Sequence, residues 1–281
     1  MEHIQIHVLH TGTVAVAPAL PFGGANCNII KASGIFEKRS NRLWLPVSCY
    51  YIEHPKGKIL VDCGWHRNMS PDGTFSPMAQ IKSLGSPLLF LVNQGMLPPN
   101  AAINEQLQKM GVLPSDLDYV LLTHLDCDHA NGLALVQEAK HIMVSADELH
   151  CARAHSKIRY QKKWWSECNL TAFAWNGTEG PAGNSYDLFN DGSVVLIAIP
   201  GHSDGQFAVK IKNSSGKFVL LFSDGGYAEK SWKEMLPSGI AVNREMQMKS
   251  LAWIKAQSMD KDCIASLANH DAHVIPHTIL L

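Results

Sequence analysis

Four short apolar runs in this sequence each end at a histidine or an aspartate, and this repeated pattern limits the folds open to the chain. The runs cover residues 117–123, 193–199, 218–222 and 263–268. Each has the length and composition of a buried β-strand. The side chains that follow them are His124, His202, Asp224 and His270. Ligands bind at the carboxyl ends of strands in open α/β sheets, so the pattern predicts a mixed α/β fold with one site at a sheet edge.

The first apolar run is followed directly by a dense group of potential metal ligands. Two imidazoles and two carboxylates fall within six residues, at His124, Asp126, Asp128 and His129. The apolar run before them and a helix-compatible stretch after them place the group on a strand-to-helix loop, where catalytic groups are common. A purely structural role would bury several charges without partners, which is costly. We therefore interpret the group as part of a metal site.

The complete set of candidate ligands is too large for one tetrahedral ion. It comprises His124, Asp126, Asp128, His129, His202, Asp224 and His270. Imidazole nitrogen and carboxylate oxygen suit zinc, manganese or iron. Two ions about 3.5–4 Å apart, with one bridging carboxylate, would use the whole set. The residues thus predict two divalent metal ions in a dinuclear hydrolase, with zinc as the first expectation and iron or manganese as alternatives.

These motifs resemble the metallo-β-lactamase superfamily, whose signature is His-x-His-x-Asp-His followed by a distant His, an Asp and a last His. Within it, the N-acyl homoserine lactonases are similar in the Pro-Gly-His-Ser sequence at 200–203 and in the interval from His202 to Asp224 (224 − 202 = 22). Residues 50–64 are similar to the hairpin ending in Asp-x-Gly that opens the first sheet. The resemblance covers about residues 47–270 and implies that Asp62 hydrogen-bonds a ligand.

The fold that the resemblance implies is an α/β (α+β) αββα sandwich with two mixed β-sheets. The ligands it implies for site one are His124, Asp126 and His202; those for site two are Asp128, His129 and His270, with Asp224 bridging. One residue departs from the signature, since Asp126 stands where the family has its second histidine. The carboxylate adds a negative charge and a harder donor, which favours iron or manganese over zinc at site one.

The activity implied is that of a metal-dependent hydrolase acting on ester or lactone bonds. It would open N-acyl homoserine lactones or related lactones, as in quorum quenching, through attack by a metal-bound hydroxide. Tyr227 falls where those lactonases carry a tyrosine that contacts the substrate, and it would steady the oxyanion. We count it with Asp126 and Asp128 as catalytic, and Asp126 or Asp224 would relay a proton to the leaving alkoxide.

Other functions are compatible with the same residues. A glyoxalase II-like thioesterase would use the same metals on a thioester. A non-hydrolytic di-iron protein that reacts with oxygen is favoured by the Asp126 carboxylate. A phosphodiesterase would need phosphate-binding groups, and the sequence has no evident Gly-rich phosphate cradle. A non-catalytic metal-stabilised protein would not need seven ligands.

Composition indicates a single domain over residues 1–281. The 46% hydrophobic content can form a large core, and no Pro/Ser/Gly-rich linker divides the chain. A net charge of −1 gives no support for nucleic acid or a membrane surface as partners. The first residues lack a signal-peptide pattern, so we expect a cytoplasmic protein with a small-molecule substrate, as a monomer or homodimer. The seven cysteines contain no tandem Cys-x-x-Cys and should stay reduced, with Cys127 packed beneath the loop.

Three further segments bear on the site. Residues 145–175 are helix-compatible, and Trp164 and Trp165 within them either line an acyl channel or pack in the core while the basic side chains face solvent. Residues 75–99 form an insertion that could cap the site or a dimer partner. Residues 243–259 predict a helix whose apolar side chains belong to the core.

Overall fold

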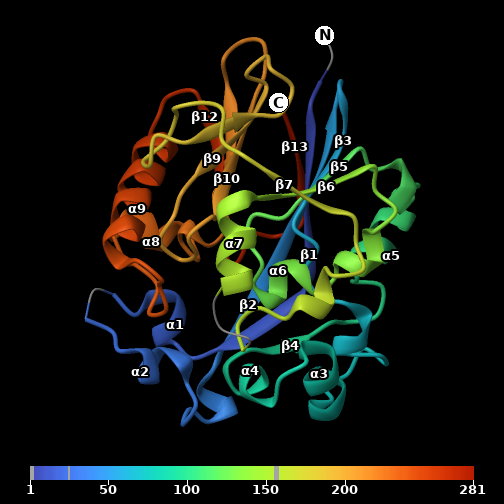
Figure 1. Cartoon of the computed structure of the whole chain (residues 1–281), viewed down its shortest axis with the longest axis vertical. Helices are drawn as coiled ribbons and strands as arrows, with labels where there is room; N and C mark the ends of the chain where they lie inside the picture. The colour runs from blue at the N-terminus through green and yellow to red at the C-terminus, as the bar shows by residue number, and fades with distance from the viewer. Residues whose placement is uncertain (1–2, 25, 155–157) are drawn as a thin grey trace.

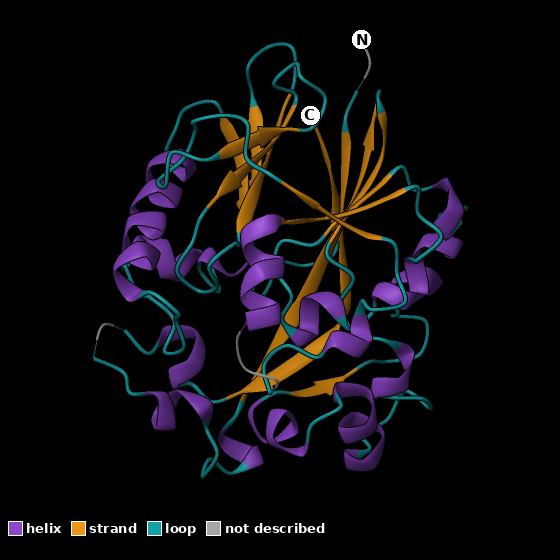
Figure 2. Ribbon diagram, in the orientation of Figure 1, coloured by secondary structure: helices purple, strands orange, loops and turns teal. Residues whose placement is uncertain are grey.

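Two mixed β-sheets pack face to face and carry helices on their outer faces (Figures 1 and 2). This architecture is seen in a computed structural model that describes residues 3–24, 26–154 and 158–281. The eight-stranded sheet has the order β13 (His277–Leu280), β1 (Gln5–Val16), β2 (Leu43–His54), β3 (Gly57–Val61), β5 (Tyr119–Leu121), β6 (His141–Ser145) and β7 (Leu170–Phe173), with β4 (Gln94–Met96) paired to β1. The five-stranded sheet has the order β12 (Cys263–Leu267), β11 (Phe218–Leu221), β10 (Phe207–Lys212), β9 (Val194–Ala198) and β8 (Ser185–Asp187). The predicted αββα sandwich is confirmed.

The helices fall into groups that cover the two sheets and their lower ends. They are α1 (Ala19–Phe22), α2 (Ile29–Ser33), α3 (Pro77–Leu84), α4 (Pro87–Val92), α5 (Ile103–Lys109), α6 (Cys127–Ala130), α7 (Ala146–Ala154), α8 (Glu229–Lys233) and α9 (Arg244–Ser258). Figure 1 shows α8 and α9 beside the five-stranded sheet and α5 beside the eight-stranded one. No helix of the described residues is both long enough and apolar enough to cross a membrane.

Three apolar layers hold the sandwich together. The middle layer lies between the sheets and joins side chains such as Ile52 of β2 with Phe207 of β10. A second layer packs α5 and its neighbours on the eight-stranded sheet, and a third packs Leu251 and Ile254 of α9 on the five-stranded sheet. Burial of both faces of each sheet explains why the strands read as continuous apolar runs in the sequence.

The four apolar runs that end at a histidine or an aspartate all form strands, which are β5, β9, β11 and β12. The first belongs to the eight-stranded sheet and the other three to the five-stranded sheet. Strand β10 is antiparallel to both β9 and β11, and β12 is parallel to β11. The strands β9, β11 and β12 therefore run in one direction, and their carboxyl ends share one edge of the sheet.

Two local predictions are wrong. The helix expected after His129 begins earlier, because α6 spans Cys127–Ala130 inside the ligand group and a short 3-10 helix at Leu133–Val136 follows. Residues 145–175 do not form one helix: α7 is followed by a 3-10 turn at Lys162–Trp164 and by β7, and residues 155–157 of this segment lie outside the described part of the chain. The helix predicted at 243–259 is confirmed as α9, whose N-terminus is capped by the Asn243 side chain.

Candidate metal centre

All seven predicted ligands meet at one edge of the sandwich. Loops after β5, β9, β11 and β12 carry them, and their ligand atoms form three overlapping groups in which every atom lies within 4.8 Å of the others. The groups are His124, Asp126 and His202; Asp128, His129 and His270; and His124, His129 and Asp224. The first two groups coincide with the ligand sets implied by the family resemblance. Asp224 lies between them, 3.4 Å from His129 Nε2 and 3.7 Å from His202 Nε2.

Hydrogen bonds on the far side of three imidazoles fix which nitrogen faces the centre. His129 Nδ1 donates to Asp62 Oδ2 at 2.8 Å, and His270 Nδ1 donates to the Pro46 carbonyl at 2.7 Å. His124 Nδ1 lies 3.1 Å from Thr123 Oγ1, whose single proton goes to Asp62. Since these partners act as acceptors, each Nδ1 carries a proton, and each Nε2 is the nitrogen that faces the centre and can bind a metal ion once it is deprotonated.

The atoms that face the centre lie close to one another but make no hydrogen bonds within the described part of the chain. Among the described residues, His124 Nε2, His129 Nε2, His270 Nε2 and Asp224 Oδ1 are buried and make no hydrogen bond. Buried polar atoms of this kind are costly, and a group of them around one point is typical of a metal site. The donor set therefore fits the metal ions that the sequence predicts.

The charges of the centre also favour a bound cation. Burial lowers the pKa of His129, but Asp62 and Asp224 outweigh it and raise that pKa well above its ordinary value. Burial raises the pKa of Asp224, yet His270 and His129 bring it well below its ordinary value. The buried carboxylates thus draw positive charge into the centre, and a divalent ion would supply it.

Asp126 occupies a different environment from the other ligands. Its Oδ1 accepts from Arg159 Nε at 2.6 Å, and its Oδ2 accepts from Arg159 Nη2 at 2.8 Å. The Oδ2 atom also lies 2.9 Å from His202 Nε2 and 3.5 Å from His124 Nε2. Although burial opposes it, Arg159 lowers the pKa of Asp126 well below its ordinary value. The carboxylate that replaces the family's histidine is therefore paired with an arginine.

Two buried carboxylates hold the ligand loops in place. Asp62 accepts from Thr123 N at 2.8 Å and from Asn269 Nδ2 at 2.9 Å, and its backbone takes a left-handed conformation at φ 59°. Glu148 of α7 accepts from Leu125 N at 3.0 Å in the β5 loop and from Ser203 Oγ at 2.6 Å in the β9 loop. Asp62 thus matches its predicted role.

Glu148 and Arg159 were both missed at the sequence level. Glu148 has the position of an ordinary acidic residue in the first turn of a helix, so only its complete burial reveals the role. Arg159 lies in the segment for which one of the two interpretations placed the basic side chains in solvent, and neither interpretation gave it a partner. The signal that could have found it is Asp126 itself, because a carboxylate added to a crowded site needs a positive partner.

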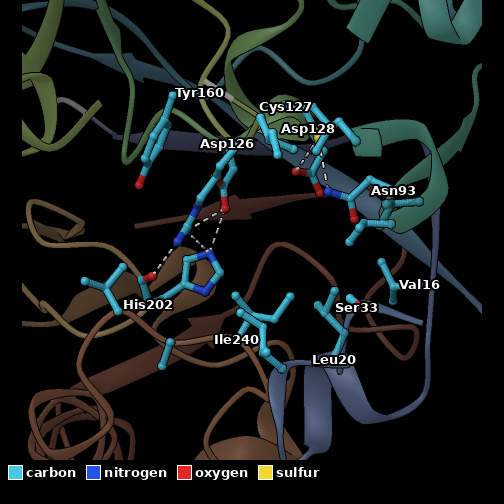
Figure 3. Close-up of a pocket in the computed structure, with 18 of the residues that line it drawn as sticks. Val16, Leu20, Ser33, Asn93, Asp126, Cys127, Asp128, Tyr160, His202 and Ile240 are labelled. Atoms are coloured by element: carbon cyan, nitrogen blue, oxygen red, sulfur yellow. Dashed lines mark hydrogen bonds and ion pairs between the residues drawn. The ribbon is translucent and has the colours of Figure 1, made fainter. Parts of the chain in front are cut away.

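A cavity of about 430 Å³ opens onto the centre. Its inner end is lined by Asp126, Asp128, His202 and Tyr227. Its walls are largely apolar and include Val14, Val16, Leu20, Leu89, Val92 and Ile240. Figure 3 shows Val16 and Leu20 across the cavity from Asp126 and Tyr160. Such a space, apolar with a few polar groups at one end, suits a small ligand.

The residues that line the cavity bear on hypotheses that the sequence left open for three parts of the chain. Leu89, Val92 and Asn93 of the insertion at 75–99 line the cavity, as the hypothesis of a cap over the site requires. A contact of this insertion with a dimer partner stays a prediction. Trp164 and Trp165 are packed in the apolar layer of the eight-stranded sheet, and neither is among the described residues that line the cavity, so the acyl-channel role considered for them is wrong. Cys127 is buried at the cavity wall and accepts from Asn93 Nδ2 at 3.3 Å, in agreement with its predicted packing role.

Tyr227 lies over the second group of ligands. Its ring stacks on His270 at 5.1 Å between centroids and meets His202 edge-on at 5.9 Å. Burial, followed by the charges of Asp224 and Asp128, raises the pKa of Tyr227 well above its ordinary value. The hydroxyl therefore stays protonated and can donate a hydrogen bond.

Residues 42–220 match the family described as the metallo-beta-lactamase superfamily, and the chain belongs to that superfamily. An N-acyl homoserine lactonase from Bacillus cereus is 26% identical over 224 residues, which cover 76% of this chain and 77% of the relative. The structure of an N-acyl homoserine lactone hydrolase, with the product N-hexanoyl-L-homoserine bound at its catalytic metal centre, superposes with a TM-score of 0.73 at 22% identity, covering 97% of this chain and 95% of the other. AidC, a dizinc quorum-quenching lactonase, gives a TM-score of 0.63 at 13% identity, with 96% and 88% covered.

Proposed function

We propose that this chain is a metal-dependent lactonase that opens N-acyl homoserine lactones. The observation that carries the proposal is the cavity, whose apolar walls end at a cluster of imidazoles and carboxylates. An acyl chain fits the apolar part, and the lactone ring then lies at the polar end. The relatives with this activity support the substrate class.

The proposed ligands are those predicted from the sequence. His124, Asp126 and His202 would hold one divalent ion, and Asp128, His129 and His270 the other, with Asp224 between them. Such ions supply Lewis acidity toward a carbonyl and an acidified water. Zinc remains our first choice, because the imidazole nitrogens suit it and AidC is a dizinc enzyme.

The chain's own groups would orient the substrate and handle its charge. Tyr227 would donate from its hydroxyl to the carbonyl oxygen as negative charge develops there. Asp126 and Asp224 were the two carboxylates predicted to relay a proton to the leaving alkoxide. Arg159 keeps Asp126 ionised, and two histidines of the centre keep Asp224 ionised, so both are poorly suited to deliver a proton. We assign that role to Asp128, which lines the same end of the cavity. The apolar walls exclude water from the remainder of the site.

The structure offers little to the two alternative activities. A glyoxalase II-like thioesterase would bind a polar, anionic thiol carrier, for which the apolar walls are a poor match. The di-iron alternative was favoured by the extra negative charge of Asp126, and Arg159 compensates that charge. The cytoplasmic location and the choice between monomer and homodimer stay predictions from the sequence.

The direct test is ring opening of N-acyl homoserine lactones of graded acyl length by the zinc-loaded protein, followed by acid release. A glutathione thioester offered at the same concentrations serves as the competing substrate. We expect turnover of the lactones, loss of it on chelation and recovery on adding zinc back. Faster cleavage of the thioester, or lactone turnover that survives complete metal removal, would contradict the proposal.

A further inference from the structure

We infer that Arg159 competes with metal for the His124, Asp126 and His202 half of the centre, so that the two ions bind with unequal affinity. The inference rests on the proposed two-metal function. It concerns how the centre is filled and makes no further claim on the substrate.

The guanidinium contacts the very atoms that an ion in this half would need. Nε and Nη2 of Arg159 donate to both carboxylate oxygens of Asp126, at 2.6 and 2.8 Å. The same Nη2 lies 3.1 Å from His202 Nε2, and Nη1 donates to the His202 carbonyl at 3.1 Å. Arginine is held here by a fork of hydrogen bonds that fits the carboxylate geometry.

His202 Nε2 is engaged in either tautomer. If Nε2 is unprotonated, it accepts from Arg159 Nη2; if it carries the proton, it donates to Asp126 Oδ2 at 2.9 Å. A metal ion needs a neutral imidazole with a free lone pair. Binding in this half therefore has to break the contacts that Arg159 makes with Asp126 and His202.

The other half presents no such competitor. His129 Nε2 and His270 Nε2 are buried and make no hydrogen bond to any described residue. Their Nδ1 atoms are already held by Asp62 and by the Pro46 carbonyl, so the rings are oriented before an ion arrives. An ion entering this half displaces protons from the imidazoles but, among the described residues, no cationic side chain, and we assign it the higher affinity.

The charges of Asp126 and Arg159 also predict weaker metal binding in this half. Asp126 adds one negative charge where the family signature has a neutral histidine, and Arg159 returns one positive charge at hydrogen-bond distance. A divalent ion beside the guanidinium would meet a like charge in a largely buried site. Removal of Arg159 should therefore leave a carboxylate that attracts the ion more strongly.

The test is a zinc titration of the metal-free protein, followed by calorimetry and by competition with a chelator. The wild type is compared with Arg159→Met, which keeps an apolar stem, and with Arg159→Lys, which keeps the charge but loses the fork. Lys162→Gln is the matched control, because it removes a positive charge from an exposed residue of the same segment. Circular dichroism and elemental analysis establish folding and the number of ions bound.

We expect two unequal sites in the wild type. In Arg159→Met the weaker site should tighten by about tenfold to a hundredfold, the equivalent of hydrogen bonds to charged groups. Arg159→Lys should show a smaller gain, and Lys162→Gln should match the wild type. Two equal sites in the wild type, or a weaker site that is unchanged or lost in both Arg159 variants, would overturn the inference.

Lactone turnover is measured on the same samples at saturating zinc. Two sites of unequal zinc affinity without lactone turnover would contradict the proposed function and still support competition between Arg159 and metal. Lactone turnover with two sites of equal zinc affinity would support the proposed function and contradict the competition. The two proposals therefore fail by different results.

Discussion

The two halves of the centre use similar ligands in opposite ways. In the half built on His129 and His270, hydrogen bonds on the outer side of the rings leave the inner nitrogens open. In the half built on Asp126 and His202, an arginine engages the inner atoms themselves. The difference teaches that a ligand list does not define a metal site; the partners behind and beside each ligand decide which atoms are available.

The largest effect should come from removing a ligand of the half formed by Asp128, His129 and His270, which we call the open half. His129→Ala is expected to bind about one ion fewer per chain and to lose about a thousandfold in turnover, because metal ions contribute several kcal/mol to such transition states. Elemental analysis and initial rates measure both. His141→Ala, a change at an exposed histidine at the start of β6, is the control. A His129→Ala protein that keeps its full metal content would remove the distinction between the halves.

The next effect concerns the carboxylate that orients the open half. Asp62→Ala leaves Thr123 N, Asn269 and His129 without their shared acceptor. We expect metal affinity to fall by about tenfold to a hundredfold, as is usual for groups that hold metal ligands. Chelator competition measures it, with Asp72→Ala on the surface for comparison. If the tighter metal site keeps its affinity in Asp62→Ala, the proposed difference between the two halves is contradicted.

Glu148→Gln tests whether Glu148 supports the half formed by His124, Asp126 and His202, which we call the arginine-paired half. The buried carboxylate accepts from Leu125 N, Ser203 Oγ and Gly205 N, and an amide can accept fewer of these bonds. We expect the free energy of unfolding to fall by about 1–3 kcal/mol, with the weaker metal site affected more than the tighter one. Urea denaturation and zinc titration measure the two effects. Glu167→Gln at an exposed position should change neither, and an equal loss at both sites would argue against a link to one half.

The smallest expected effect is at Tyr227, which contacts rings from both halves. Tyr227→Phe keeps the stacking on His270 and removes only the hydroxyl. A loss of about tenfold in kcat corresponds to one hydrogen bond, whereas KM and both metal affinities should hold. Steady-state kinetics across acyl lengths measure it. An unchanged kcat would leave the ring as a packing element alone.

Much of this centre could be predicted from the sequence, because short-range patterns carry it. Each apolar run is continuous and short, and the residue after it is a His or an Asp, so both the strand and its ligand are visible locally. The sandwich came from resemblance and is confirmed. The pairing of ligands into two groups also came from resemblance, and the structure brings the same residues close together.

The parts that were missed depend on contacts between distant segments. Arg159 pairs with Asp126 from 33 residues away, in a stretch whose composition resembles a solvated surface. Glu148 connects two loops from the first turn of α7, where an acidic residue already has a local explanation in the helix dipole. The two tryptophans were ambiguous because an aromatic pair suits either a channel or a core, and only the position of the cavity in the folded chain separates the two.

The division of the ligands between two sheets has a thermodynamic consequence. The loop after β5 belongs to one sheet, whereas Asp224 and His270 follow β11 and β12 of the other. An ion held by both sets cross-links the sheets, so its binding energy adds to the free energy of unfolding, by about 2.7 kcal/mol per site at a hundred times Kd. The thermal stability of this protein should therefore report the free zinc concentration around it, rising with the logarithm of that concentration once the open half fills and more steeply once the arginine-paired half fills as well.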